Sequence, residues 1–169
     1  MEKAVILKKG KEKSVLRHHP WVLSGAVERV EGRCEPGDVV RVVGRAGNFL
    51  ALGFYNPVSP IPVRLFSWDR QSIVRHFWAQ ALQTAVSLRV HPVIPEGTNA
   101  CRLVFSESDF MPGLIVDRYD DYLVVQFLNP GMARLKDKIV QYLMALVSPR
   151  GIYEKSDSDI LKLEGLIPH

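Results

Sequence analysis

Short hydrophobic runs separated by glycine and proline dominate the first 70 positions of the chain. Most of them are rich in β-branched or aromatic residues, which is typical of strands, and they cover residues 3–9, 21–32, 39–43, 49–56 and 61–68. Between the first two runs, KEKSVLRHH fits about two helical turns that end at His19-Pro20. Many short strands in so few residues predict a small β-barrel over residues 1–70.

The spacing of apolar residues changes to three and four after the last of these runs, which is the helical period. We expect an amphipathic helix that begins at Asp69 or Ser72 and ends at His91-Pro92. Its expected apolar stripe is Val74, Phe77, Trp78, Ala81, Leu82, Ala85 and Leu88. The breaker-rich HPVIPEGTN follows, so residues 71–98 are predicted to be a connecting helix and linker, and the helix could belong to either side.

Residues 99–169 follow a strand, strand, strand, helix, strand pattern. The predicted strands are CRLVFS, LIVDRY, YLVVQFL and GIYEKSD. The helix is expected from about Gly131 to Val147, with a buried stripe of Met132, Leu135, Ile139, Tyr142, Leu143 and Leu146. The predicted fold class is therefore α+β, a small β-barrel followed by a small α+β sandwich in which one helix covers an antiparallel sheet.

Positive charge is concentrated near the start of the chain. Residues 1–70 contain 12 lysines and arginines against 7 acidic residues, whereas residues 71–169 contain 10 against 11. Within residues 3–17, six cations face only Glu12, and they are Lys3, Lys8, Lys9, Lys11, Lys13 and Arg17. This imbalance favours a polyanionic partner, although a solvated charged helix end is the alternative.

The sequence LRHHPWVLSG combines cations with flat rings. His18 and His19 are adjacent, so their rings diverge and are poorly placed to hold one metal ion together. Rings beside cationic groups suit an unstacked base and its phosphates. We expect Arg17 and His18 to face outward, whereas core packing is the favoured interpretation of Trp21 because WVLSGAV looks like a buried strand.

An acidic group in the second unit offers an alternative function. Glu107, Asp109 and Asp117 could hold a hard cation in a metallohydrolase, whereas Asp120-Asp121 fits a hairpin turn. Phe110-Met111 puts large apolar side chains in a loop, where they could pack on a neighbouring domain or serve a protein-interaction or dimerisation module. The chain contains no nucleotide-binding glycine motif, and Cys34 and Cys101 suggest neither a disulfide framework nor a zinc site.

No apolar stretch approaches the roughly 18 residues of a membrane helix, and MEKAVILKKGKEK lacks the apolar core of a secretion signal. We therefore expect a cytoplasmic protein with both cysteines reduced and no membrane partner.

Four segments together resemble one known family, and they are KKGKEKSVLRHHPWVLSGAVERVEG, GDVVRVVGRAGNFLALGFYNPVSPIPVRLFSWD, ESDFMPGLIVDRYDDYLVVQF and RGIYEKSD. The chain is similar to the amino-terminal portion of the class I S-adenosylmethionine-dependent 23S rRNA cytosine-5 methyltransferases of the large-subunit type. The resemblance implies that the barrel is an RNA-binding PUA domain and that residues 99–169 are the family's central α+β domain. The chain departs from the pattern at Cys101, where tyrosine is usual, and at Phe110-Met111, where Gly-Leu is common.

The resemblance also implies what this chain does for the longer protein. In that family a carboxyl-terminal Rossmann-like domain binds S-adenosylmethionine and carries the nucleophilic cysteine, and this chain ends before such a domain. We therefore expect a fragment that is inactive alone, with no catalytic, cofactor-binding or metal-binding residue. Its expected role is to bind and position ribosomal RNA, and it could form a homo-oligomer or pack on the missing catalytic domain. The expected RNA contacts are Lys8, Lys9, Lys11, Lys13, Arg17 and His18, with Asn56 and Arg64 as weaker candidates on the barrel.

Overall fold

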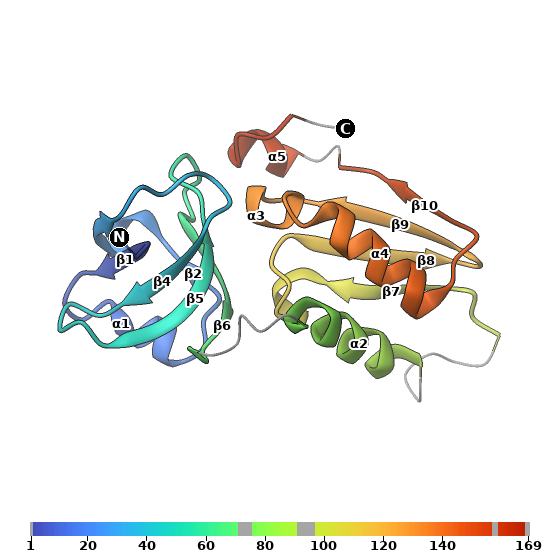
Figure 1. Cartoon of the computed structure of the whole chain (residues 1–169), viewed down its shortest axis with the longest axis horizontal. Coiled ribbons are helices and arrows are strands. Elements are labelled where there is room, and N and C mark those ends of the chain that lie inside the picture. Colours follow the sequence, from blue (N-terminus) through green and yellow to red (C-terminus); the bar gives the residue numbers. More distant parts are fainter. Residues whose placement is uncertain (1, 71–75, 91–96, 157–158, 168–169) are drawn as a thin grey trace.

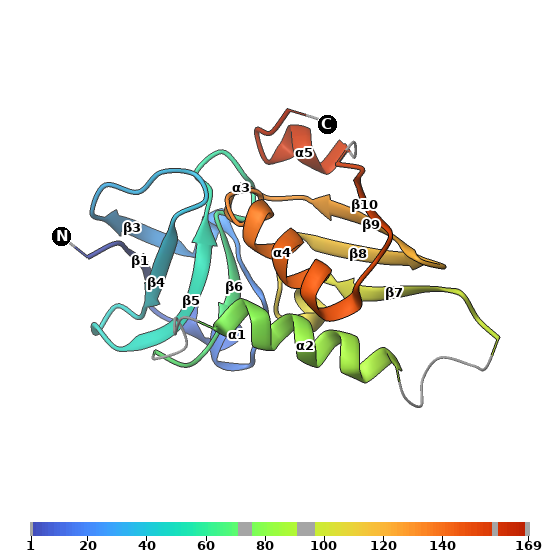
Figure 2. The same cartoon turned by 45° about the vertical axis from the view of Figure 1, so that its right-hand side comes forward.

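Two β-sheets organise the chain, as the computed structural model of residues 2–70, 76–90, 97–156 and 159–167 shows. One sheet has six strands and curls into an open barrel, and the other has four strands and lies beside it (Figure 1). Turned by 45°, the molecule shows α2 (Phe77–Val90) and α4 (Lys136–Val147) lying across one face of the second sheet (Figure 2). The fold class predicted from the sequence, a small barrel followed by an α+β unit, is confirmed.

The barrel sheet holds its strands in the order β2-β6-β5-β4-β1-β3. Their bounds are β1 (Ala4–Leu7), β2 (Trp21–Val22), β3 (Val27–Glu31), β4 (Val39–Val43), β5 (Phe49–Tyr55) and β6 (Val63–Ser67). β1 pairs with β4 in parallel, and the other pairs are antiparallel. The run at 21–32 is not one strand, because a 3₁₀ turn at Ser24–Ala26 sends β2 and β3 to opposite edges of the sheet.

The second sheet has the order β10-β9-β8-β7. Its elements are α2 (Phe77–Val90), β7 (Ala100–Phe105), β8 (Leu114–Tyr119), β9 (Tyr122–Phe127), α3 (Pro130–Ala133), α4 (Lys136–Val147) and β10 (Gly151–Glu154), and α5 (Asp159–Leu163) follows. The prediction of an antiparallel sheet is wrong for β10, which runs parallel to β9. The helical connection between β9 and β10 returns the chain to the end of the sheet where β9 began, so the two strands point the same way.

The helices also differ from the prediction. The helix expected from Gly131 to Val147 is divided into α3 and α4, because Gly131 packs against Phe54 of the barrel while Ile139 and Leu143 of α4 join the core of the second sheet. Two helices cover the sheet rather than one, since α2 contacts both β7 and α4. The predicted apolar stripes extend too far, because Leu88 and Leu146 are exposed. The predicted start of α2 at Asp69 is wrong, because Asp69 is followed by a turn and α2 begins at Phe77, whereas the alternative start at Ser72 lies outside the described residues.

One hydrophobic core joins the two sheets. The barrel strands carry apolar residues on both faces, so Leu50 packs inside the barrel while Leu52 and Phe54 face the second sheet. There they join Phe66 and the buried side chains of α2, β7, β8, β9 and α4. Since buried apolar area stabilises the folded state, this shared core fixes the position of the barrel beside the second sheet.

Candidate nucleic-acid interface

The cation-rich segment folds as a short helix on the outside of the barrel. α1 (Glu12–Leu16) is anchored by Val15, which is buried in the barrel core, while its other side chains point away from that core. The helix ends where His19 N donates to Ser14 O and His18 N donates to Val15 O, which is the Schellman pattern. His18 adopts the left-handed conformation that this ending requires, with φ of 61°.

We define the basic arm as Lys8, Lys9, Lys11, Lys13 and Arg17, all of which are exposed. Lys8 Nζ donates to Gly25 O at 3.0 Å, and this carbonyl leaves the lysine charge unneutralised. For the other four side chains, the described part of the chain provides neither a hydrogen-bond acceptor nor a carboxylate partner. The positive charges of the basic arm therefore face solvent and are available to an anion.

Cations elsewhere in the barrel are mostly neutralised by neighbouring carboxylates. Lys3 Nζ lies 2.6 Å from Asp38 Oδ2, so Lys3 does not belong to the basic arm. The arginines that pair with glutamates are Arg29, Arg33, Arg41, Arg45 and Arg64. This contrast makes the basic arm a local positive surface rather than one part of an evenly charged barrel.

Aromatic rings lie directly beside the basic arm. The ring of His18 stacks on Trp68, with centroids 4.7 Å apart and planes 24° apart. Trp68 Nε1 donates to Val15 O at 2.7 Å, which holds the indole against α1. The ring of Phe110 from the second unit packs nearly perpendicular to the ring of Trp68, with centroids 6.1 Å apart. The prediction that this loop packs on a neighbouring domain is confirmed for Phe110, whereas Met111 is buried in the shared core.

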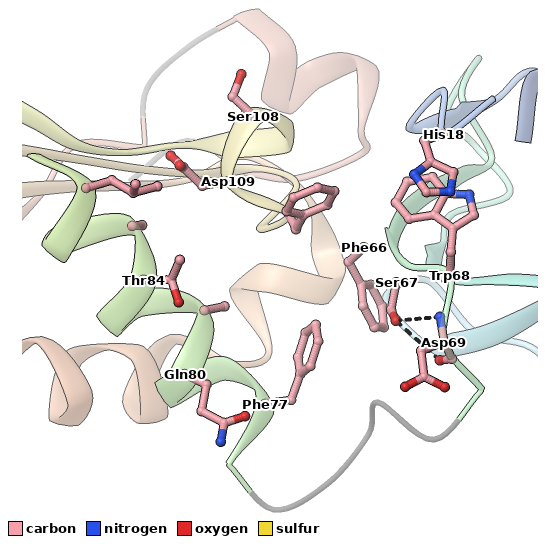
Figure 3. Close-up of a pocket in the computed structure, with 14 residues that line it drawn as sticks. His18, Phe66, Ser67, Trp68, Asp69, Phe77, Gln80, Thr84, Ser108 and Asp109 are labelled. Carbon is pink, nitrogen blue, oxygen red and sulfur yellow. Dashed lines mark hydrogen bonds between the residues drawn. The ribbon is translucent and has the colours of Figure 1, made fainter.

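A cavity of about 450 Å³ opens next to these rings (Figure 3). Its aromatic lining consists of His18, Phe66, Trp68, Phe77 and Phe110. α2 supplies the opposite wall with Gln80, Ala81, Thr84, Ala85 and Leu88, and Ser67, Asp69, Ser108 and Asp109 complete the lining. The cavity thus lies between the barrel, α2 and the loop before β8, and His18 links it to the basic arm.

Trp21 is not a core residue, since 38% of its surface is exposed. Its Nε1 donates to Glu107 Oε1 at 2.9 Å, and the guanidinium of Arg64 lies 5.8 Å from the centre of its ring. The core interpretation of Trp21 is therefore wrong. The indole lies at the junction between the barrel and the second unit.

Asn56 and Arg64 do not lie on an open surface, contrary to the RNA contacts that the resemblance implied for them. Asn56 is buried and its Nδ2 donates to Glu164 Oε2 at 2.8 Å. Arg64 is mostly buried and donates to Glu107 at 2.9 Å and to Glu164 at 2.7 Å. Both side chains are held in an internal network with Glu164, so this structure presents neither of them to RNA.

Glu107 is held in its charged form by its neighbours. Burial by itself would raise its pKa, but hydrogen bonds from Ser106, Trp21 and its own backbone N–H, together with the charge of Arg64, keep the pKa below its ordinary value of 4.5. Because Glu107 joins the loop before β8 to the barrel, its charge contributes to the attachment between the two units.

We predict that acid weakens the fold through Glu107. Its folded-state pKa lies below 4.5, so its contribution is fully present above that pH and is lost as the pH falls through the folded value. Urea unfolding of the wild type and Glu107→Gln between pH 7 and pH 3 measures this contribution. The variant should lose less stability than the wild type over that range, and parallel acid dependence would show that Glu107 contributes nothing.

Each acidic residue proposed for a metallohydrolase forms an ion pair with an arginine. Glu107 pairs with Arg64, Asp109 with Arg89 at 2.9 Å, and Asp117 with Arg102 at 2.7 Å. Across the part of the chain that the structure describes, no cluster of three His, Cys, Asp or Glu residues could hold a metal ion. The carboxylates that the sequence suggested as ligands therefore form separate ion pairs.

The resemblance implies S-adenosylmethionine as the cofactor of the longer protein. The strand-turn-helix segment from β9 to α3 does not fit this cofactor. Cofactor loops of this kind use glycine so that the backbone can approach the ligand. Here Gly131 approaches the barrel instead, because a Cβ at this position would overlap the ring of Phe54. The turn is filled by the chain's own core.

Comparison with protein families identifies the first unit. Residues 5–68 match the family model described as a PUA-like domain. This range contains every strand of the barrel sheet except the first residue of β1. Within the described residues, no helix is long and apolar enough to cross a membrane.

Curated relatives extend the similarity over almost the whole chain. The Ribosomal RNA large subunit methyltransferase I of Vibrio vulnificus (strain CMCP6) is 40% identical over 166 residues, which is 98% of this chain and 42% of that protein. Its counterpart from Escherichia coli (strain SMS-3-5 / SECEC) is 38% identical over 167 residues, with the same coverage of each. The chain thus spans less than half the length of the relatives that it matches.

Solved structures share the arrangement of both units. A candidate SAM-dependent methyltransferase from Streptococcus mutans aligns with a TM-score of 0.78 and 20% identity, over 92% of this chain and 41% of the other. A candidate methyltransferase complexed with SAH aligns with a TM-score of 0.79 and 20% identity, over 92% of this chain and 40% of the other. The chain therefore contains a PUA-like domain within an α+β fold, and it is homologous over nearly its whole length to part of the large-subunit rRNA methyltransferases.

Proposed function

We propose that this chain binds ribosomal RNA through the basic arm and holds the RNA for a methyltransferase domain. In the longer protein, that domain would use S-adenosylmethionine to methylate C5 of a cytosine in 23S rRNA. The proposed site of action is the cytoplasm. The proposed contacts in this chain are Lys8, Lys9, Lys11, Lys13, Arg17 and His18.

The observation that carries this proposal is the set of unneutralised cations on α1 and the turn before it. Phosphate contacts by exposed lysines and arginines supply most of the sequence-independent affinity of proteins for nucleic acid. The rings of His18 and Trp68 lie next to these cations, so phosphates and a base could be bound at one place. The PUA-like match and the rRNA methyltransferase relatives support RNA as the polyanion.

Fluorescence anisotropy with labelled RNA tests the proposal directly. The chain should bind stem-loop segments of 23S rRNA at low salt, and binding should weaken as the salt concentration rises. It should also prefer a stem-loop with unpaired nucleotides over a blunt RNA duplex, because the rings need exposed bases. Absence of binding to all of these RNAs in 50 mM salt would overturn the proposed function.

A further inference from the structure

We infer that the cavity between Trp68, Phe110 and α2 accepts one unpaired nucleobase of the bound RNA. This inference rests on the proposed function and adds a binding site for a base to the phosphate-binding basic arm. The cavity volume of about 450 Å³ falls within the range of roughly 300–1,000 Å³ that is usual for pockets that bind small ligands.

The lining suits the flat faces of a base. Proteins bind unpaired bases by stacking them on aromatic side chains, and each stack tolerates any base because every base has a π-face. Trp68 and Phe110 approach edge to face, and 53% of the surface of Phe110 is exposed. Exposed rings inside a largely apolar cavity favour an aromatic ligand over an ion.

The wall opposite the barrel can meet the polar edge of a base. Thr84 and Gln80 line the cavity from α2, and the described residues include no hydrogen-bond partner for either side chain. Asp109 also lines the cavity, but Arg89 holds it with two bonds of 2.9 Å, so its charge is balanced. A neutral base can therefore enter the cavity without facing an unpaired carboxylate, because Arg89 balances the charge of Asp109.

The position of the cavity fits a nucleotide whose phosphate lies on the basic arm. His18 lines the cavity, and Arg17 precedes it in the chain. A base that enters beside His18 would leave its flanking phosphates outside, near Arg17 and the lysines of the arm. Continuity with the positive surface distinguishes RNA from an uncharged peptide as the occupant.

A cavity-filling variant tests the inference without removing any ring. Thr84→Trp places a large side chain in the cavity from the exposed side of α2, and Gln83→Trp is the matched control because Gln83 is exposed but does not line the cavity. We expect Thr84→Trp to weaken binding of a 23S rRNA stem-loop about tenfold, within the range that one stacked base contributes, and Gln83→Trp to bind as the wild type does. Phe110→Asn, which tolerates the left-handed backbone of that residue, should weaken binding in the same direction.

Photocrosslinking locates the base. Stem-loops that carry 5-iodouridine at each unpaired position in turn should crosslink at one of those positions to Trp68, Phe110 or His18 in the wild type, and Thr84→Trp should abolish that crosslink. If the wild type binds RNA but crosslinks elsewhere, and Thr84→Trp binds equally well, the cavity inference is overturned while the proposed function stands. If the wild type binds no RNA, both fail.

Discussion

Replacing Glu164 by alanine should lower the free energy of unfolding by about 3 kcal/mol, because it removes one partner of a buried ion pair. Glu164 is only 2% exposed and accepts hydrogen bonds from Arg64, Asn56 and Ser59 of the barrel. Without it, the Ser59 hydroxyl loses its acceptor in a buried place, and Asn56 Nδ2 keeps only the main-chain carbonyl of residue 164. Arg64 keeps Glu107, so the expected loss lies near the lower end of the usual range for such pairs.

Urea and thermal unfolding of Glu164→Ala measure this effect, and a loss of that size corresponds to a decrease of roughly 10 °C in Tm. Asp159→Ala at the start of α5, the short helix that ends just before Glu164, is the matched control, since Asp159 is exposed and, among the described residues, its carboxylate pairs only with the exposed Lys162. The control should change the stability by less than about 0.5 kcal/mol. A comparably small change in Glu164→Ala would mean that the contact between the turn after α5 and the barrel does not stabilise the fold.

Removing the three central lysines of the basic arm should weaken RNA binding about a hundredfold in 0.1 M salt. The estimate follows from three lost phosphate contacts, each of which contributes about 0.7 to the slope of log affinity against log salt for single-stranded RNA. The variant is Lys9, Lys11 and Lys13 replaced by alanine. These side chains are exposed, so the variant should unfold at the wild-type temperature.

A charge-matched variant separates a local contact from a general change in net charge. Lys138, Arg150 and Lys162 are exposed cations of the second unit, and their replacement by alanine removes the same number of charges. This variant should keep most of the wild-type affinity. Equal losses in both variants would mean that RNA is attracted by net charge rather than by the basic arm.

Most strands of the barrel were predictable because each carries its own local signal, and the exception is the run at 21–32, which forms β2 and β3. Runs such as VVRVV and FLALGFY are β-branched or aromatic and end at glycine or proline, so their pattern needs no information from distant residues. The direction of β10 carries no such signal, because it depends on the helical connection from β9. The break between α3 and α4 likewise reflects the packing of Gly131 on Phe54, which is far away in sequence.

The candidate site, like the fold, was predictable from the sequence only in part. The cations of the basic arm could be predicted by charge counting, because they outnumber the acidic residues close to them in the sequence. The internal position of Asn56 and Arg64 could not, since their partner Glu164 lies about a hundred residues further along the chain. The cavity is formed by residues from four segments, at 18, 66–69, 77–88 and 108–110, and only the unusual Phe110-Met111 loop indicated that the second unit would contribute to it.

The salt dependence of RNA affinity tests the central claim most directly. If Lys8, Lys9, Lys11, Lys13 and Arg17 each neutralise one phosphate, log affinity plotted against log salt should have a slope of about −3.5 for the wild type. The Lys9, Lys11 and Lys13 triple alanine variant should give a slope of about −1.4. Identical slopes for the two proteins would contradict the assignment of the basic arm as the surface that binds RNA.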